Sequence, residues 1–214
     1  MFTEHLAASL KEFADIADLS MFTIDTYHKF LNENNISHHD FIKFVGRKLP
    51  DEFLSHPYVK IVCEIAGKET GFNFGVYKNK IEFRVVRPNC GDNNPFHRDH
   101  WFPYFTPLLN VYVPLCGSYY DSSLCVVPFS HKWSDEDVVP TFTFEESAKG
   151  KKYIKNGVAY SVPDIKECKF EIKPHRPDVL LGDVMYFSPL MVHGGGSNSS
   201  LETRFSLEMR LVRV

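Results

Sequence analysis

The spacing of apolar residues changes once along the chain, near Gly71, and this change constrains the fold more than any other feature. Before Gly71, apolar residues recur every three or four positions, which is the spacing of one face of a helix. After it, they alternate with polar residues or form short runs between turn residues, as in β-strands. A chain of 214 residues is long enough for one domain with a buried core. We therefore expect a single domain over residues 1–214, with about 1–70 as helical support and about 72–214 as a strand-built core.

Four helices are expected in the first third. The first carries apolar residues from Leu6 to Leu19, and the second runs from Asp25 to Phe30 with Asp25 as its amino-terminal cap. Ser37, three residues before Asp40, predicts the start of the third helix, and the fourth is expected from about Pro57 to Ala66.

Short strands are expected in the rest of the chain. Residues 72–76 and 81–85 predict two strands around a turn at residues 78–80, and the other expected strands are Leu108–Leu115, Leu124–Pro128, Lys169–Ile172, Val179–Val192 and Arg204–Val214. Many short strands after a helical start predict an α+β, mainly β protein built on an antiparallel double sheet. Residues 134–166 are rich in charge and contain Pro and Gly, so we expect them to form an insertion.

Composition narrows the class of partner. The formal net charge of −3 provides no basic surface of the kind that dominates binding to nucleic acids. No stretch approaches the roughly 18 uncharged apolar residues of a membrane span, and the charged amino-terminal segment does not resemble a secretory signal. The five cysteines are odd in number and widely spaced, which favours a reduced, cytoplasmic protein over a disulfide framework. We expect a small-molecule substrate, without nucleic-acid or membrane partners.

The segment around His97 carries the first sign of a metal site. In an extended chain His97 and Asp99 project to the same side, so an imidazole nitrogen and a carboxylate oxygen can meet at one point. That donor pair suits a borderline metal ion. A lone His-x-Asp occurs by chance in many proteins, so further support has to come from elsewhere in the chain.

His193 and Arg204 provide that support. His193 ends an apolar run and precedes three glycines, which we expect to leave open space around its ring. His131, the main rival ligand, has no adjacent carboxylate. Arg204 lies on the following expected strand and shares a face with Ser206, where its planar guanidinium suits a carboxylate ligand. The alternative for Arg204 is an exposed strand arginine in a salt bridge.

These residues resemble the pattern of a known family. His97, Asp99, His193 and Arg204, eleven residues later, are similar to the HxD…H…R pattern of Fe(II)/2-oxoglutarate-dependent oxygenases, and in particular of the phytanoyl-CoA dioxygenase-like proteins. Residues 122–133, Ser-Ser-Leu-Cys-Val-Val-Pro-Phe-Ser-His-Lys-Trp, resemble that group's GSLxVVPGSHKW segment, with Phe129 where the family usually has glycine. The resemblance covers about residues 72–214.

The resemblance implies a double-stranded β-helix, or jelly roll, supported by the amino-terminal helices. It implies a dioxygenase in which His97, Asp99 and His193 are the catalytic Fe(II) ligands and Arg204 binds the far carboxylate of 2-oxoglutarate. O2 is the other co-substrate, and the products are a hydroxylated small molecule, succinate and CO2. Halogenating relatives lack the carboxylate, so Asp99 favours hydroxylation.

Other positions are weaker candidates. Arg84 precedes the motif and is a candidate 2-oxoglutarate contact, with a salt bridge as the alternative. Asn110, within an apolar strand, needs polar partners and is a candidate cofactor or substrate contact. Trp101 is a candidate pocket wall, with a place in the core as the alternative. The aromatic residues Phe102, Tyr104 and Phe105 are expected to line the pocket, with the 134–166 insertion as a mobile cover.

Two alternatives stay open. One is a cupin-like lyase or isomerase that uses the metal without 2-oxoglutarate, against which Arg204 argues, because a metal site alone needs no carboxylate clamp. The other is a jelly-roll binding protein without catalytic activity, against which the complete set of ligands argues.

Overall fold

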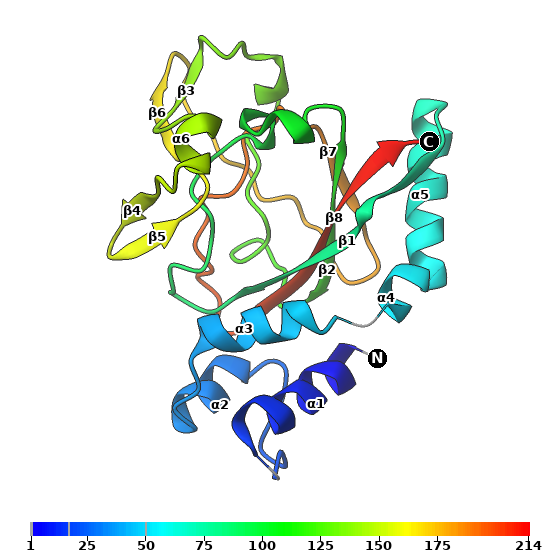
Figure 1. The fold of residues 1–214 in the computed structure, drawn as a ribbon, viewed down its shortest axis with the longest axis vertical. Helices are drawn as coiled ribbons and strands as arrows, with labels where there is room; N and C mark the ends of the chain where they lie inside the picture. The colour runs from blue at the N-terminus through cyan, green and yellow to red at the C-terminus, as the bar shows by residue number, and fades with distance from the viewer. Residues whose placement is uncertain (1, 17, 50) are drawn as a thin grey trace.

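In the computed structural model, which describes residues 2–16, 18–49 and 51–214, helices cover one face of a four-stranded antiparallel sheet (Figure 1). The sheet has the order β1-β8-β2-β7, with β1 at Phe74–Val86, β2 at Leu109–Cys116, β7 at Met185–Phe187 and β8 at Arg204–Arg213. The helices are α1 (Phe2–Ala14), α2 (Tyr27–Glu33), α3 (His38–Arg47), α4 (Glu52–Ser55) and α5 (Pro57–Thr70). None of these helices, among the residues described, is long and apolar enough to cross a lipid bilayer.

The first two helices differ from their predicted bounds. Helix α1 ends at Ala14 instead of continuing to Leu19, because Asp15 takes a left-handed conformation (φ 53°) that interrupts the helix. Leu19 still packs against the core from the segment that follows. Helix α2 begins at Tyr27, so Asp25 is not its cap, and the capping residue Thr26 makes no side-chain capping bond.

The next helices follow their capping signals. The Ser37 side chain accepts a hydrogen bond from the Asp40 backbone N–H, which begins α3 as predicted. Pro57 occupies the first turn of α5, where a missing N–H costs nothing. This helix continues past Ala66 and ends at Gly71, whose left-handed φ of 76° suits glycine. The short helix α4 was not predicted.

The predicted hairpin at residues 72–85 is wrong, because these residues form one strand, β1. Both halves pair with β8, and the register shifts between Val76 and Ile81. Lys78 sits in this irregularity with a φ of 52°. The extra residues are therefore accommodated as a bulge, which bends a strand without reversing it.

The four-stranded sheet is one side of a barrel. The segments that form the opposite side contain little regular strand structure. Of the strands expected at 124–128, 169–172 and 179–192, only β7 forms a ladder, and the rest is linked by isolated bridges such as that between Val126 and His175. Pro128 ends the first of these runs, Pro174 and Pro177 separate the other two, and Pro189 interrupts the last, since proline has no N–H to donate to a ladder. The two sides together form the jelly roll that the sequence predicted, in an α+β, mainly β protein.

The two faces of the sheet have different roles. Alternate residues of β2 and β8, such as Val111 and Leu207, are buried against the helices in the main hydrophobic core. The other set on β8 is polar from Arg204 through Ser206 and Glu208 to Arg210 and ends with Val212, and its three charged residues line a cavity inside the barrel. The period-two pattern of one strand therefore separates the core from the functional cavity.

The 134–166 insertion carries more structure than its composition suggested. It contains β3 (Val138–Pro140), α6 (Phe144–Ala148), β4 (Tyr153–Lys155) and β5 (Val158–Tyr160), and β3 pairs with β6 (Ile165–Cys168). Val138 and Phe142 are almost fully buried, so the base of the insertion is anchored to the barrel. Its outer part, from α6 to β5, lies on the side of the molecule opposite α5 (Figure 1).

Candidate metal centre and its cavity

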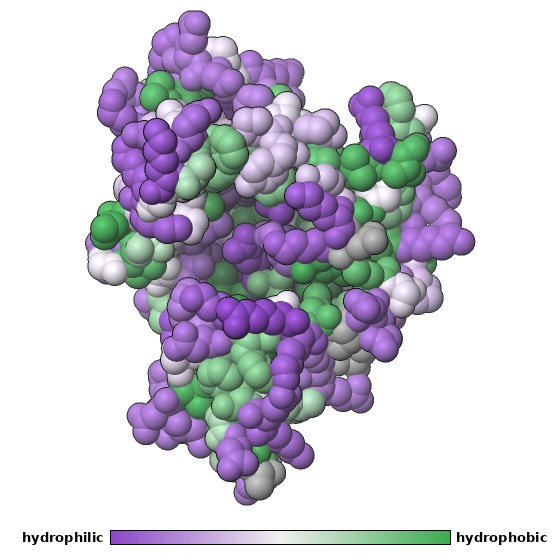
Figure 2. Space-filling model, viewed as in Figure 1, coloured by the Kyte–Doolittle hydropathy of each residue, from purple (hydrophilic) through white to green (hydrophobic). Residues whose placement is uncertain are grey.

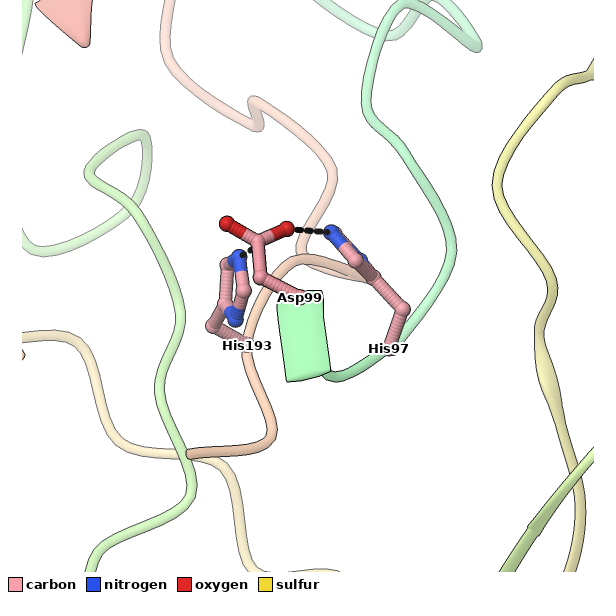
Figure 3. A group of neighbouring side chains, drawn as sticks. All are labelled: His97, Asp99 and His193. Atoms are coloured by element: carbon pink, nitrogen blue, oxygen red, sulfur yellow. Dashed lines mark ion pairs between the residues drawn. The ribbon is translucent and has the colours of Figure 1, made fainter. Parts of the chain in front are cut away.

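His97 and His193, 96 positions apart in the chain, are neighbours across an antiparallel bridge. The backbone N–H of each donates to the carbonyl of the other, at 3.0 and 2.9 Å, and the ring centroids are 4.3 Å apart. Asp99 begins the short 3₁₀-helix η1 (Asp99–Trp101) and points toward both rings (Figure 3). One ligand atom from each residue lies within 4.8 Å of the others.

The hydrogen bonds of the two histidines prepare them for a metal. The Nδ1 of His97 is 2.8 Å from the Pro95 carbonyl oxygen, and the Nδ1 of His193 is 2.9 Å from the Met191 carbonyl oxygen. Because a carbonyl oxygen only accepts, each Nδ1 must carry the hydrogen, which leaves the Nε2 lone pair free. The free Nε2 atoms lie 3.5 and 3.9 Å from Oδ1 of Asp99.

The protonation states also suit a metal. Burial raises the pKa of Asp99, but the neighbouring His97 and His193 rings and the Arg210 guanidinium outweigh it and hold the pKa well below its usual range. Burial, followed by the charge of His97, lowers the pKa of His193 to about 4. An ionised carboxylate and a neutral imidazole are the forms that bind metal ions.

Arg210 contacts Asp99 from the other side. Its Nε and Nη2 donate to Oδ2 of Asp99 at 3.1 and 2.9 Å. The two carboxylate oxygens therefore have different partners, because Oδ1 faces the histidines and Oδ2 faces the guanidinium.

Arg98, between the two predicted ligands, points away from them. Its fully buried guanidinium donates to the carbonyl oxygens of Ser130 (3.2 Å) and Trp133 (2.8 Å) and to the Asp135 carboxylate (3.0 Å). This contact ties the His-x-Asp segment to the Ser-His-Lys-Trp segment, where the 3₁₀-helix η3 (Ser130–Lys132) lies. The two sequence motifs are thus one structural unit.

His193 and Gly194 both line a cavity, so there is open space beside the ring, but the glycines after His193 are also needed for close packing of the backbone. Gly194 has a φ of 91°, and a Cβ there would lie 2.6 Å from the Pro95 carbonyl oxygen. A Cβ on Gly195 would overlap the Phe96 ring. Glycine is required here because the backbone packs closely against the segment that leads to His97.

Arg204 is a buried cation without an anionic partner among the described residues. Only 3% of its surface is exposed, and no carboxylate from the described parts of the chain lies within 4 Å of its guanidinium. Its Nη1 donates to the Ser122 carbonyl oxygen at 2.7 Å, its Nη2 lies 3.5 Å from the Asn93 side-chain oxygen, and its Nε has no acceptor. Burying an unpaired charge is costly, so this position fits an anionic ligand.

Arg204 and the three candidate metal ligands line the same cavity of about 310 Å³. Further unpaired polar atoms lie on the same face of the sheet. The Ser206 hydroxyl, between Arg204 and Glu208 on β8, and both amide atoms of Asn110 on β2 are buried without hydrogen-bond partners in the described structure. Neither residue lines the cavity itself, but both share this sheet face with residues that do, since Ser206 lies between Arg204 and Glu208 and Asn110 pairs with Arg210.

Arg84 also lines this cavity, but its guanidinium is paired. It donates to Glu208 at 3.0 Å and to Glu82 at 3.2 Å. The salt bridge that the sequence left as an alternative is therefore present.

The cavity mouth combines aromatic residues with the insertion. Phe102, Tyr104 and Phe105 line it, as predicted, and Ser147 and Ser161 of the insertion complete the wall. Figure 2 shows the hollow on this face, between the insertion and the region of helix α3. Phe144, in α6, lies against the aromatic group, with ring centroids 5.8 Å from Tyr104 and 6.1 Å from Phe102.

Two further residues, Trp101 and Arg210, remain to be compared with the sequence-based predictions. Trp101 packs with Val127, Val138 and Val192 in a small hydrophobic cluster and is not part of the cavity wall, so the core alternative holds. Arg210 was not among the predicted site residues. The sequence did contain a signal for Arg210. The alternation that groups Arg204, Ser206 and Glu208 on one face of a strand continues to this residue.

A family model described as phytanoyl-CoA dioxygenase (PhyH) matches residues 5–206 of this chain. A search of curated protein sequences returns no match. Among solved structures, AviO1 from Streptomyces viridochromogenes Tue57 is 17% identical, with a TM-score of 0.46 over 71% of this chain and 56% of that one. EvdO2 from Micromonospora carbonacea var. aurantiaca is 12% identical, with a TM-score of 0.48 over 76% and 63%.

SnoN, described as the non-heme alpha ketoglutarate dependent epimerase from nogalamycin biosynthesis, is 16% identical, with a TM-score of 0.47 over 75% of this chain and 54% of that one. The chain spans less than two thirds of the length of each of these proteins. The family match, in contrast, extends over nearly the whole chain. The chain therefore belongs to the phytanoyl-CoA dioxygenase family, whose members use Fe(II) with 2-oxoglutarate and O2 as co-substrates.

Proposed function

We propose that this protein is an Fe(II)- and 2-oxoglutarate-dependent dioxygenase that hydroxylates a small molecule and releases succinate and CO2. One observation carries the proposal. A single buried cavity contains three converging metal-ligand atoms and an arginine that has no carboxylate partner in the described structure. A metal site alone would not need the arginine, and an anion site alone would not need the ligands.

The metal would be held by Nε2 of His97, Nε2 of His193 and Oδ1 of Asp99. The two Nδ1–H bonds to backbone carbonyls fix both ring orientations before any ion arrives. Three protein ligands on one side leave coordination positions open. The bound metal and 2-oxoglutarate together supply the O2 activation that hydroxylation requires.

Arg204 would bind the far carboxylate of 2-oxoglutarate. Its Nε is free, and its Nη2 makes only the long contact with Asn93, so two donors on one edge of the guanidinium are available to a carboxylate. Ser206, two residues along β8 with an unpaired hydroxyl, is a supporting candidate. Asn110, which pairs with Arg210 farther along β8, remains a candidate contact for the cofactor or the substrate. We keep Arg84 as a weaker candidate, because its guanidinium already binds two glutamates.

The primary substrate would enter at the aromatic mouth. A cavity of about 310 Å³ is at the small end of ligand sites, and 2-oxoglutarate would fill part of it. This size favours a small molecule over a protein segment or a nucleic acid. An intact Asp99 favours hydroxylation, since halogenating relatives lack this carboxylate.

Anaerobic titration of the purified protein with Fe(II) and 2-oxoglutarate tests the proposal without a known substrate. A weak visible charge-transfer band is expected when both are present, and it should be lost in His193→Ala. His131→Gln is the matched control, because this histidine lies outside the ligand cluster and should leave the band unchanged.

The alternatives give different results in the same titration. Metal binding without the band would favour the cupin-like enzyme, which does not use 2-oxoglutarate. No metal binding at all would favour the binding protein without catalytic activity.

A further inference from the structure

We infer that Arg210 is a positioning residue that holds Asp99 so that only one of its carboxylate oxygens is available to the metal. The inference rests on the proposed metal site and adds a residue to it. It comes from the division of the Asp99 carboxylate between two sets of partners.

The guanidinium of Arg210 directs two donors to the same oxygen. Its Nε and Nη2 lie 3.1 and 2.9 Å from Oδ2 of Asp99, whereas Oδ1 lies 3.5 and 3.9 Å from Nε2 of His97 and His193. A pair of charge-assisted bonds restricts rotation of the carboxylate. Oδ1 is therefore directed at the point where the two histidines converge.

Arg210 is itself held in place. Its guanidinium carbon lies 4.0 Å from the centre of the Phe105 ring, and its Nη1 is 3.6 Å from Oε2 of Glu82. Its backbone belongs to β8, which pairs with β1 on one side and β2 on the other. A stacked and paired guanidinium on a central strand is a rigid support.

The arrangement has a chemical consequence. With Oδ2 free, the carboxylate can rotate and bind the metal through both oxygens, which would occupy a coordination position that 2-oxoglutarate needs. Arg210 blocks this, and its positive charge compensates the buried carboxylate when no metal is bound. Residues that orient metal ligands in this way affect metal affinity by about 10- to 100-fold.

Two other roles for Arg210 are plausible on position alone, since it lines the cavity. It can contribute only stability through its ion pairs, or it can bind the substrate. Two of its three guanidinium nitrogens are used on Asp99 and the third faces Glu82, which argues against substrate binding.

The test uses Co(II) as the metal probe and two variants, Arg210→Met and Arg210→Lys. We expect Arg210→Met to bind Co(II) 10- to 100-fold more weakly than the parent, and to bind 2-oxoglutarate more weakly even at saturating Co(II). Its Co(II) absorption spectrum should change in intensity. Arg210→Lys restores one donor and should recover part of each property.

Arg213→Met is the matched control. Arg213 lies on the same strand and also stacks on an aromatic ring, with its guanidinium carbon 3.6 Å from the centre of Phe72. It is not among the cavity-lining residues, so this variant should keep the parental affinity and spectrum.

Parental metal and 2-oxoglutarate binding by Arg210→Met would overturn the inference, as would equal weakening in Arg210→Met and Arg213→Met. Either result would leave the proposed function intact. If the parent bound no Co(II), or His193→Ala bound it equally well, the proposed function itself would fail.

Discussion

Replacing Arg204 with methionine should weaken the binding of 2-oxoglutarate without lowering the free energy of unfolding of the ligand-free protein. Methionine keeps much of the side-chain length but removes the charge and all donors. Each hydrogen bond to a charged group contributes about 1.5 to 3 kcal/mol, so losing the donors on Nε and Nη2 costs about 3 kcal/mol or more. We expect 2-oxoglutarate to bind at least about 10²-fold more weakly, since 1.4 kcal/mol corresponds to tenfold.

The ligand-free protein should respond differently. Arg204 is a buried charge with no anionic partner in the described structure, and its removal relieves that burial cost while giving up one bond to the Ser122 carbonyl. We therefore expect the free energy of unfolding of ligand-free Arg204→Met to equal or exceed that of the parent.

Denaturant unfolding of the Fe(II)-loaded proteins under anaerobic conditions measures both effects. At a 2-oxoglutarate concentration of about 100 times the parental Kd, the parent should gain about 2.7 kcal/mol, and a variant with 100-fold weaker binding only about 0.4 kcal/mol. Arg84→Met is the contrasting variant. It leaves Glu208 without an arginine, so it should lower the stability of the free protein and keep most of the gain from 2-oxoglutarate.

The reasoning would be refuted if Arg204→Met gained as much stability from 2-oxoglutarate as the parent did. A ligand-free Arg204→Met that lost more than about 2 kcal/mol would show that the cation is already satisfied in the fold. If 2-oxoglutarate no longer stabilised Arg84→Met, Arg84 would instead be identified as a direct contact of 2-oxoglutarate.

Three further predictions concern the rest of the molecule. Phe129 holds a left-handed φ of 66° with an exposed side chain, so Phe129→Gly should stabilise the protein by about 0.5 to 1 kcal/mol in denaturant unfolding; a destabilised variant would contradict this. Burial lowers the pKa of His38 from 6.5 to about 4, so the unfolded chain takes up a proton first and stability is lost as the pH falls from 6.5 to 4. The contribution is about 2 kcal/mol between pH 7 and pH 5, and His38→Gln should show a shallower loss of stability over this range; an equal pH dependence would exclude His38 as the source. Limited proteolysis should cut first within residues 143–161 and should slow when Fe(II), 2-oxoglutarate and a substrate that supports succinate release are all present; cleavage elsewhere, or no protection, would exclude a lid.

The sequence alone determined features that depend on neighbours in the chain. Ser37 and Pro57 mark helix starts through contacts within one turn, and the structure confirms both. The change of period near Gly71 predicted the α+β class. The HxD…H…R set and the segment at residues 122–133 predicted the family, because both are patterns of residue types that can be read directly from the sequence.

Only the tertiary structure decided which residues meet across the barrel. Asp99 and Arg210 are 111 positions apart, and nothing in either segment predicts their bond. Arg84 is paired with Glu208 because β1 lies beside β8 in one register, and the bulge at Lys78 keeps β1 as one strand. Register depends on the packing of the whole sheet and not on the residues of one strand, so the partners of each charge could be assigned only once the strands had been placed side by side.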